Sequence, residues 1–298
     1  MENKLKSSIH IFLVLMTFFF SGCSLNVDIG GFFFPSDLID SRFKQSEQWN
    51  NSHLFKQLTV SSENYQILVA GDSHIGGFAE VSHSEGLKNF TKLVIEAKKP
   101  ENTAFLIVGD IVSGQKEDFD SLKANLPDYN INPYFLLVGN HDLYFDGWKT
   151  FYNYFGSSTY YFSIKTPTFS DLYICLDSGS GTLGVGQLAW LKNVLETERA
   201  KYRNCFVFSH VNFFRNRRTG STNPLVDELY VLMDLFATNR VNLVISGHDH
   251  VRSLNYFGFT TYITMDALLD ANPNASILKL TVSTTKTSFS FMDLKSLN

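Results

Sequence analysis

The chain has 298 residues, of which 44% are hydrophobic and 18% are charged, so it carries enough apolar side chains to bury a large core. This composition excludes a disordered protein over most of the length, since disordered chains are poor in hydrophobic residues. The formal net charge is -4, from 25 basic and 29 acidic residues, which gives no general sign of a nucleic-acid-binding surface.

The N-terminal segment has the pattern of an export signal. Two lysines precede an apolar run from Ile9 to Phe20, and small residues follow up to Cys23. A transmembrane anchor is the alternative, but the run is shorter than the roughly 20 apolar residues that span a bilayer. We therefore predict a signal peptide over residues 1–22.

The sequence FSGC at the end of this segment resembles the lipobox of bacterial lipoproteins, although Phe20 stands where that family usually has leucine. The resemblance implies that Cys23 becomes the lipid-bearing first residue of the mature protein. Several acyl chains on Cys23 would anchor the protein stably, because a single chain binds a membrane only marginally. By the sorting rules of such lipoproteins, Ser24 implies the outer membrane of a two-membrane bacterium, so we predict an exported, membrane-anchored protein of the cell envelope.

The rest of the chain divides into an extension and one domain. Residues 23–62 are rich in glycine and polar residues with little periodicity, and we interpret them as a tether plus a segment that lies on the domain. Over residues 63–298, apolar runs alternate with amphipathic ones, which favours an α/β core. Helices are expected over residues 86–99 and 186–201. Six apolar runs are candidate strands, most of them too continuously hydrophobic to face water: residues 66–70, 104–108, 134–138, 172–176, 205–209 and 242–246.

After His250 the pattern changes to alternating strand-like pieces without clear helices, at residues 262–269, 275–282 and 287–294. A two-sheet β-sandwich flanked by helices, of the mixed α/β (α+β) class, fits both halves of the domain. Cys175 and Cys205 fall inside apolar strand-like runs, where cysteine packs as a small hydrophobic residue. We expect buried free thiols there, with a disulfide between the two as the alternative.

Polar groups follow five of the apolar runs, and glycine begins four of these groups. Glycine allows the backbone to turn sharply or to approach a ligand closely. The strands would place these polar side chains at one end of the sheets, where sites in α/β proteins generally lie. The groups are Gly71-Asp72-Ser73-His74, Gly109-Asp110, Gly139-Asn140-His141-Asp142, His210 and Gly247-His248-Asp249-His250.

Each group alone is explained by ordinary turn chemistry or by a hydrogen-bonded structural histidine. Together they would bury more titratable groups than a protein tolerates without bound cations. Imidazole and carboxylate ligands without thiolate suit divalent Zn, Mn, Fe, Co or Ni. Seven candidate ligands are enough for two ions that share a bridging carboxylate: Asp72, His74, Asp110, Asn140, His210, His248 and His250.

The order D-x-H, G-D, G-N-H-D, H and G-H-x-H resembles that of the calcineurin-like metallophosphoesterases, over about residues 65–265. The resemblance implies two divalent metal ions, such as Mn, Fe or Zn, and in-line attack on phosphorus by a hydroxide that bridges them. It also implies which residues hold which ion: Asp72, His74 and His250 the first, Asn140, His210 and His248 the second, and Asp110 both.

The resemblance further implies that His141 acts near the leaving-group oxygen, as a general acid or charge stabiliser, while Asp142 orients its ring. Turn capping is the alternative for Asp142. Tyr144, Phe213 and Arg215 are candidate substrate contacts, since aromatic faces beside a guanidinium suit a nucleotide-like base and an anionic phosphate. The alternative for these three residues is ordinary packing, which the 15% aromatic content of the chain favours.

These features predict an exported, membrane-tethered, dinuclear-metal phosphoesterase that hydrolyses phosphate monoesters or diesters, with a nucleotide-like small molecule as one candidate substrate. A nuclease of the same fold is one alternative, against which the near-neutral charge counts. A non-catalytic surface lipoprotein that retains the fold is another, against which the full ligand set counts. A single-zinc peptidase would require the motif H-E-x-x-H, which does not occur in the sequence.

Overall fold

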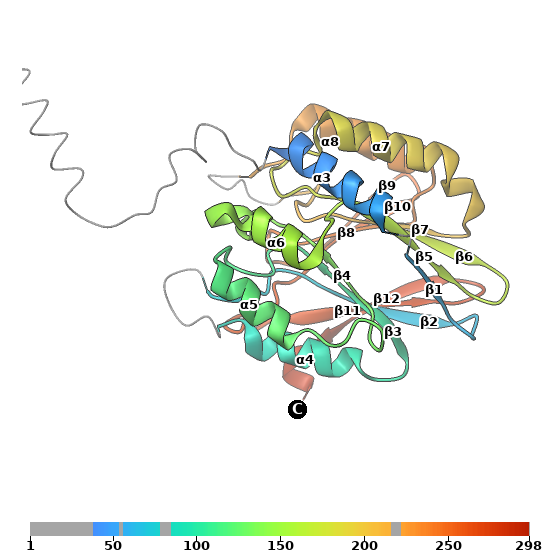
Figure 1. Cartoon of the computed structure of the whole chain (residues 1–298). Coiled ribbons are helices and arrows are strands. Elements are labelled where there is room, and N and C mark those ends of the chain that lie inside the picture. Colours follow the sequence, from blue (N-terminus) through green and yellow to red (C-terminus); the bar gives the residue numbers. More distant parts are fainter. Residues whose placement is uncertain (1–37, 54–55, 78–84, 216–221, 298) are drawn as a thin grey trace, which may run out of the picture. The chain divides into compact units, whose positions relative to one another are not determined.

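The computed structural model describes residues 38–53, 56–77, 85–215 and 222–297. Within these ranges the strands form two mixed sheets that pack face to face, with helices on both outer surfaces (Figure 1). One sheet has the strand order β1-β5-β6-β7-β8-β10-β9, and the other has the order β12-β11-β2-β3-β4. The predicted two-sheet sandwich flanked by helices is confirmed.

The larger sheet consists of β1 (Lys56–Thr59), β5 (Tyr160–Lys165), β6 (Ser170–Cys175), β7 (Cys205–Phe208), β8 (Leu243–Ser246), β10 (Thr260–Thr264) and β9 (Ser253–Phe257). The smaller sheet consists of β12 (Thr287–Asp293), β11 (Ser276–Val282), β2 (Tyr65–Ala70), β3 (Asn102–Val108) and β4 (Tyr134–Leu137). Strands β2, β3 and β4 pair in parallel, as do β6, β7 and β8. Their carboxyl ends therefore meet along one edge of each sheet.

Helices cover the outer face of each sheet. The smaller sheet carries α4 (Leu87–Ala97), α5 (Lys116–Asn125) and α6 (Gly147–Phe155), and the larger sheet carries α3 (Ile39–Ser52), α7 (Gly184–Thr197) and α8 (Val226–Thr238). The three short 3₁₀ helices in the described residues are η1 (His141–Asp146), η2 (Arg199–Lys201) and η3 (Leu294–Ser296). The helices expected over residues 86–99 and 186–201 correspond to α4 and α7.

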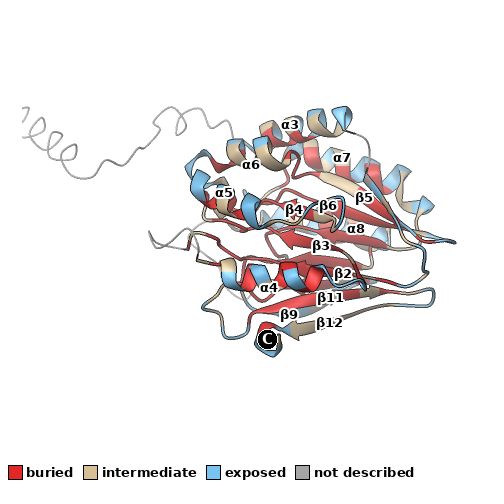
Figure 2. Cartoon of the chain, turned by 60° about the horizontal axis from the view of Figure 1, so that its bottom comes forward, coloured by how far each residue is buried: buried red, intermediate tan, exposed pale blue. Residues whose placement is uncertain are grey.

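The core has three apolar layers, one between the sheets and one under each set of helices. Figure 2 shows the buried residues filling the strands and the inward faces of the helices. Between the sheets, Phe135 of β4 stacks on Phe162 of β5 with ring centroids 3.6 Å apart. This contact joins the edge strand of the smaller sheet to the larger sheet. Such burial favours the folded state by about 25 cal/mol per Å² of apolar surface.

Helix α3 lies in the segment that the sequence assigned to the tether and extension. Its Arg42 is fully buried and forms a bidentate ion pair with Asp177, with Nε 2.7 Å from Oδ2 and Nη2 3.0 Å from Oδ1. Arg42 Nη2 also donates a hydrogen bond to Ser180 Oγ. From residue 38 onward, this segment is therefore part of the folded unit and is fixed to the turn after β6.

The predicted signal peptide (residues 1–22) and the lipidation site Cys23 lie outside the described residues. Within the part of the chain that the structure does describe, no helix combines the length and the apolar character needed to cross a membrane. Cys175 and Cys205 are buried and are not joined by a disulfide, as expected, and burial raises the pKa of the Cys205 thiol to about 12.

Candidate active site

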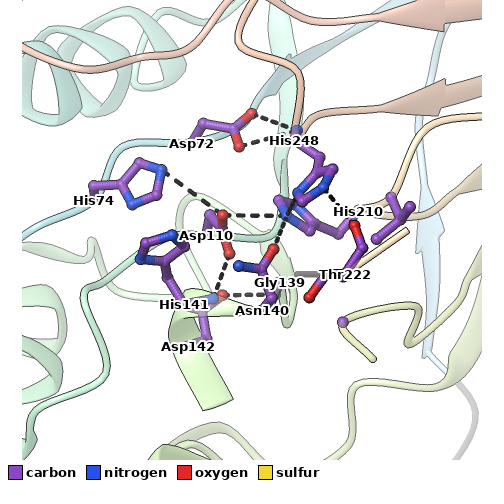
Figure 3. Close-up of polar contacts among 12 residues, drawn as sticks. Asp72, His74, Asp110, Gly139, Asn140, His141, Asp142, His210, Thr222 and His248 are labelled. Carbon is purple, nitrogen blue, oxygen red and sulfur yellow. Dashed lines mark hydrogen bonds and ion pairs between the residues drawn. The ribbon is translucent and has the colours of Figure 1, made fainter. Parts of the chain in front are cut away.

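The seven predicted metal ligands meet where β2, β3, β4, β7 and β8 end, although they come from five separate segments of the chain. Figure 3 labels all of them except His250. We call them the site cluster: Asp72, His74, Asp110, Asn140, His210, His248 and His250. All of them are buried except His250, which is partly exposed. The sequence prediction that these groups lie together at one end of the sheets therefore holds in the structure.

Two glycines let the strands bring carboxylates into this crowded position. A side chain at Gly247 would overlap the Oδ2 atom of Asp72, and one at Gly139 would overlap the Oδ1 atom of Asp110. Each carboxylate accepts a backbone hydrogen bond from the loop it approaches. His248 N donates to Asp72 Oδ1 at 3.0 Å, and His141 N donates to Asp110 Oδ1 at 2.8 Å. The glycines thus allow each acid to connect two strand ends.

The backbone of the site cluster is strained. Five of its seven residues have a positive φ, between 46° and 73°, in the left-handed region that non-glycine residues rarely occupy. These residues are Asp72, His74, Asp110, His248 and His250. Residues in such conformations concentrate at functional sites, where the surrounding structure must hold them in place.

The cluster divides into two donor groups that share Asp110. Ligand atoms within each group lie within 4.8 Å of one another, and the groups are Asp72, His74, Asp110 and His250, and Asp110, His210 and His248. Asn140 Oδ1 lies 3.2 Å from His210 Nε2, which places the amide with the second group. Two donor groups with one shared carboxylate match the needs of a pair of divalent ions.

The histidines present lone pairs to this space. His210 Nδ1 lies 2.9 Å from the carbonyl oxygen of Val108, and His248 Nε2 lies 3.0 Å from that of Thr222. Because a carbonyl only accepts, these ring nitrogens carry the protons, and in the neutral rings the opposite nitrogens carry lone pairs. Those nitrogens, His210 Nε2 and His248 Nδ1, face each other at 3.2 Å. Two lone pairs this close require a proton or a cation, so the donor set fits a bound metal.

Without metal, burial and the neighbouring carboxylates determine which histidines of the site cluster are protonated. Burial lowers the pKa of His74 to about 3 and that of His248 to about 4, so both rings are neutral at pH 7. Burial also acts to lower the pKa of His210, but Asp110 outweighs it and raises that pKa to about 9. His210 Nε2 lies 3.2 Å from Asp110 Oδ2. Metal binding would therefore release the proton of His210, since a histidine ligand must be neutral.

His141 lies against the cluster and outside both donor groups. Its ring is half-buried and meets the ring of His74 edge-on, with centroids 4.5 Å apart. Asp142 does not orient this ring, contrary to the expectation from the resemblance. Its Oδ1 accepts hydrogen bonds from the amides of Ile111 and Val112, and its Oδ2 accepts one from Gly139. Asp142 therefore joins the loops after β3 and β4, closer to the turn-capping alternative.

The three candidate substrate contacts occupy different positions. Tyr144 is 40% exposed beside His141, with ring centroids 4.7 Å apart, and its hydroxyl accepts a hydrogen bond from Asn140 Nδ2 at 3.3 Å. Phe213 packs in the apolar layer under α8, against Phe236. Arg215 is partly buried, and its Nη2 lies 2.9 Å from Asp249 Oδ1. Phe213 and Arg215 therefore have structural roles, and of the three candidates only Tyr144 lies at the surface of the site.

Sequence reasoning missed Ser178, which holds the His210 loop. Its hydroxyl accepts hydrogen bonds from the amides of His210 and Val211, both at 2.9 Å. The preceding residue is Asp177, the partner of Arg42. A signal was present, because the run over 172–176 is followed by Asp177 and Ser178, a polar pair after a strand like those that supplied the other site residues.

A sequence model of the calcineurin-like phosphoesterases matches residues 65–252, which include the whole site cluster. The chain therefore belongs to the calcineurin-like phosphoesterase family. The family and the donor set together identify a metal-dependent phosphoric ester hydrolase, and they confirm the prediction of a two-metal cofactor. A comparison with curated proteins gave no match.

Solved structures with this fold are distant in sequence. A dimetal phosphatase from Danio rerio has a TM-score of 0.58 and 12% identity, and the match covers 77% of this chain and 96% of that one. The purple acid phosphatase PPD1 from yellow lupin (Lupinus luteus) has a TM-score of 0.61 and 15% identity, covering 80% of this chain and 53% of that one. GAP50, the anchor in the inner membrane complex of Plasmodium, has a TM-score of 0.54 and 15% identity, covering 79% and 86%. At these identities the likeness concerns the fold.

Proposed function

We propose that this protein hydrolyses phosphate monoesters or diesters at a two-metal centre, outside the cytoplasm and tethered to a membrane. The observation that carries the hydrolytic part is Asp110, which is shared by two groups of converging ligand atoms. GAP50 has this fold and is described as an anchor. The fold alone therefore does not imply turnover, and the proposal rests on the site cluster.

In this proposal, the residues of the site cluster are divided between the two ions. Asp72, His74 and His250 would hold one ion, Asn140, His210 and His248 would hold the other, and Asp110 would serve as a ligand to both. When bound, the two cations supply charge for the phosphoryl oxygens and lower the pKa of water for the attack. The carbonyls of Val108 and Thr222 fix the ring orientations of His210 and His248.

His141 is the group placed to serve the leaving oxygen. Its ring lies beside His74 and next to Tyr144, at the surface of the cluster. In the protonated form it donates a proton or a hydrogen bond to the oxygen that departs, which matters most for esters with poor leaving groups. Asp142 fixes the backbone on which His141 stands, through its three amide contacts.

The test uses the full-length chain in detergent, stripped of metal and reloaded with Mn, Zn or Fe. We expect about two ions per chain and metal-dependent hydrolysis of aryl phosphate monoesters or diesters. His141→Ala should keep both ions and lose about 10²- to 10⁴-fold in turnover on esters with poor leaving groups. Two ions without hydrolysis of either ester would contradict the proposed reaction, and equal loss on good and poor leaving groups would remove the proton-donor role.

The proposed location rests on the sequence of residues 1–23. The apolar run and the FSGC sequence support cleavage before Cys23 and lipidation of that residue. Cys23→Ser should release the protein from the membrane fraction, whereas the matched variant Ser24→Ala should remain bound. An uncleaved Cys23→Ser chain that stays in the membrane would support a signal anchor instead.

A further inference from the structure

A cavity of about 460 Å³ opens where β4 and β5 face each other beneath α3, and it contains no residue of the site cluster. Its size falls in the range of small-molecule pockets, which is about 300–1,000 Å³. Tyr134 and Phe135 of β4 and Tyr160 of β5 supply part of the wall. The C-terminal half of α3 forms another part. We call this cavity the aromatic pocket.

Most side chains that line the aromatic pocket carry rings, and the rings are held by their neighbours. Trp49 stacks on His53 with centroids 3.8 Å apart and planes inclined by 10°. Any side chain at Gly156 would overlap the Trp49 ring, so the indole packs directly on that backbone. The rings that line the pocket include Trp49, Tyr129, Tyr134, Tyr160, Tyr161 and Trp190. A rigid ring loses little conformational entropy when a ligand binds.

Polar groups are placed among these rings. The Tyr160 hydroxyl donates to the carbonyl of Leu136 at 3.0 Å, and Asn50 Nδ2 donates to that of Thr159 at 2.7 Å. The lining also contains the exposed side chains of Glu47 and Asn51. Phenol, amide and carboxylate groups together can accept from and donate to hydroxyl groups of a ligand.

The charge of the lining excludes a phosphate-type ligand. Among the described residues that line the aromatic pocket there is no lysine or arginine, and Glu47 is the acidic one. An anion there would lack the charge-assisted hydrogen bonds on which phosphate recognition depends. The pocket therefore differs in chemistry from the site cluster, and its ligand is not a second phosphate ester.

We propose that the aromatic pocket binds a neutral saccharide. A sugar ring has a face of C–H groups, which packs on aromatic rings, and a rim of hydroxyls, which pairs with phenols, amides and a carboxylate. A purely aryl ligand would cover the same rings but would form no hydrogen bond with the exposed Glu47 and Asn51 side chains of the lining. The saccharide site is independent of the proposed phosphoesterase function.

The experiment titrates two neutral tetrasaccharides, cellotetraose and tetra-N-acetylchitotetraose, into the full-length chain by calorimetry. We expect at least one of them to bind with one site per chain, and the planar aryl alcohol 2-naphthol to bind more weakly. Tryptophan fluorescence gives a second readout, because Trp49 and Trp190 line the pocket while Trp148 is buried elsewhere. Metal-stripped protein should bind the saccharides equally well, so this test does not depend on whether the protein hydrolyses phosphate esters.

Three variants test the location. Trp190→Ala should weaken saccharide binding at least tenfold, which corresponds to about 1.4 kcal/mol. Glu47→Ala, an exposed change that leaves the fold intact, should weaken it about threefold by loss of a charged hydrogen bond. The matched control is Tyr256→Ala, an exposed aromatic residue on β9, which should change the affinity less than twofold.

Binding that Trp190→Ala and Glu47→Ala weaken and Tyr256→Ala leaves intact supports the proposal. Absence of binding to both tetrasaccharides overturns it. Saccharide binding that neither pocket variant alters places the site elsewhere and also overturns it. If 2-naphthol binds more tightly than either saccharide, the ligand class is wrong.

Discussion

Two of the places where the protein buries charged groups differ in how the charge is balanced. Arg42 and Asp177 satisfy each other, with two short contacts between a guanidinium and a carboxylate and additional hydrogen bonds to Ser180 and from Gly179. In the site cluster, by contrast, imidazole nitrogens face each other at 3.2 Å. The first place is complete within the chain, whereas the second is completed by cations. The comparison separates a structural ion pair from a site made to receive a ligand.

The strongest test of this contrast removes the shared carboxylate. Asp110→Ala should lower turnover at least 10³-fold, or about 4 kcal/mol of transition-state stabilisation, because both ions lose a ligand. Metal analysis should find the bound ions reduced from about two per chain to one or none. Glu117→Ala, an exposed acid on α5, is the control. Two bound ions and normal turnover in Asp110→Ala would refute the assignment of Asp110 as a bridge.

The second test removes one partner of the Arg42–Asp177 ion pair. Arg42→Met should destabilise the fold by about 3–5 kcal/mol, because it leaves the buried Asp177 carboxylate without its partner. The double variant Arg42→Met/Asp177→Leu should be more stable than Arg42→Met alone, since no buried charge remains. Denaturant unfolding of the unaltered chain, the single variant and the double variant measures these differences in the free energy of unfolding.

The exposed pair Lys116–Asp120, with 62% and 46% of the side chains exposed, gives the control for this test. Lys116→Met should change the stability by less than about 1 kcal/mol. A double variant as unstable as Arg42→Met would mean that packing, and not the unpaired charge, dominates the effect.

Metal removal should lower the stability of the protein through the site cluster. At an ion concentration one hundred times the Kd, metal binding stabilises the folded chain by about 2.7 kcal/mol, so a chelator should lower the melting temperature by several degrees. The same chelator should lower the melting temperature of Asp110→Ala much less, because this variant binds fewer ions. An equal chelator effect on both chains would show that the stabilising ion binds elsewhere.

The smallest effect is expected at the surface of the cluster. Tyr144→Phe removes one hydroxyl that accepts from Asn140 at 3.3 Å, and a single neutral hydrogen bond contributes about 0.5–1.5 kcal/mol. We expect up to about a tenfold loss in kcat/KM with both metals retained. A larger loss together with loss of one ion would make Tyr144 part of the support of the metal site.

The sequence predicts the parts of this molecule that depend on local pattern. Continuous apolar runs gave six strands, and the glycines and polar residues directly after them gave the residues that meet in the site cluster. Helix α3 was missed because its helical periodicity is weak. Its position depends on Arg42 pairing with a residue 135 positions away, and no local pattern contains such a contact. The contacts of Asp142 were missed for the same reason, since two of its three amide partners, Ile111 and Val112, follow the neighbouring strand β3.

The aromatic pocket also lay beyond prediction from sequence. Its rings come from α3, the loop before β4, β4, α6, β5 and α7, and a chain with 15% aromatic residues gives each ring little weight by itself. The same applies to Arg215, which the sequence offered as a candidate substrate contact with ordinary packing as the alternative. Only the fold shows that Asp249 occupies its guanidinium.

The left-handed backbone at Asp72, His74, Asp110, His248 and His250 limits which amino acids these positions can carry. Asparagine, aspartate, histidine and glycine adopt that conformation most readily, whereas β-branched residues resist it. A saturation mutagenesis of these five codons would therefore show two overlapping filters, one for metal coordination and one for backbone geometry. Asparagine would be tolerated better for folding than threonine or valine at each position, even in variants that no longer bind metal.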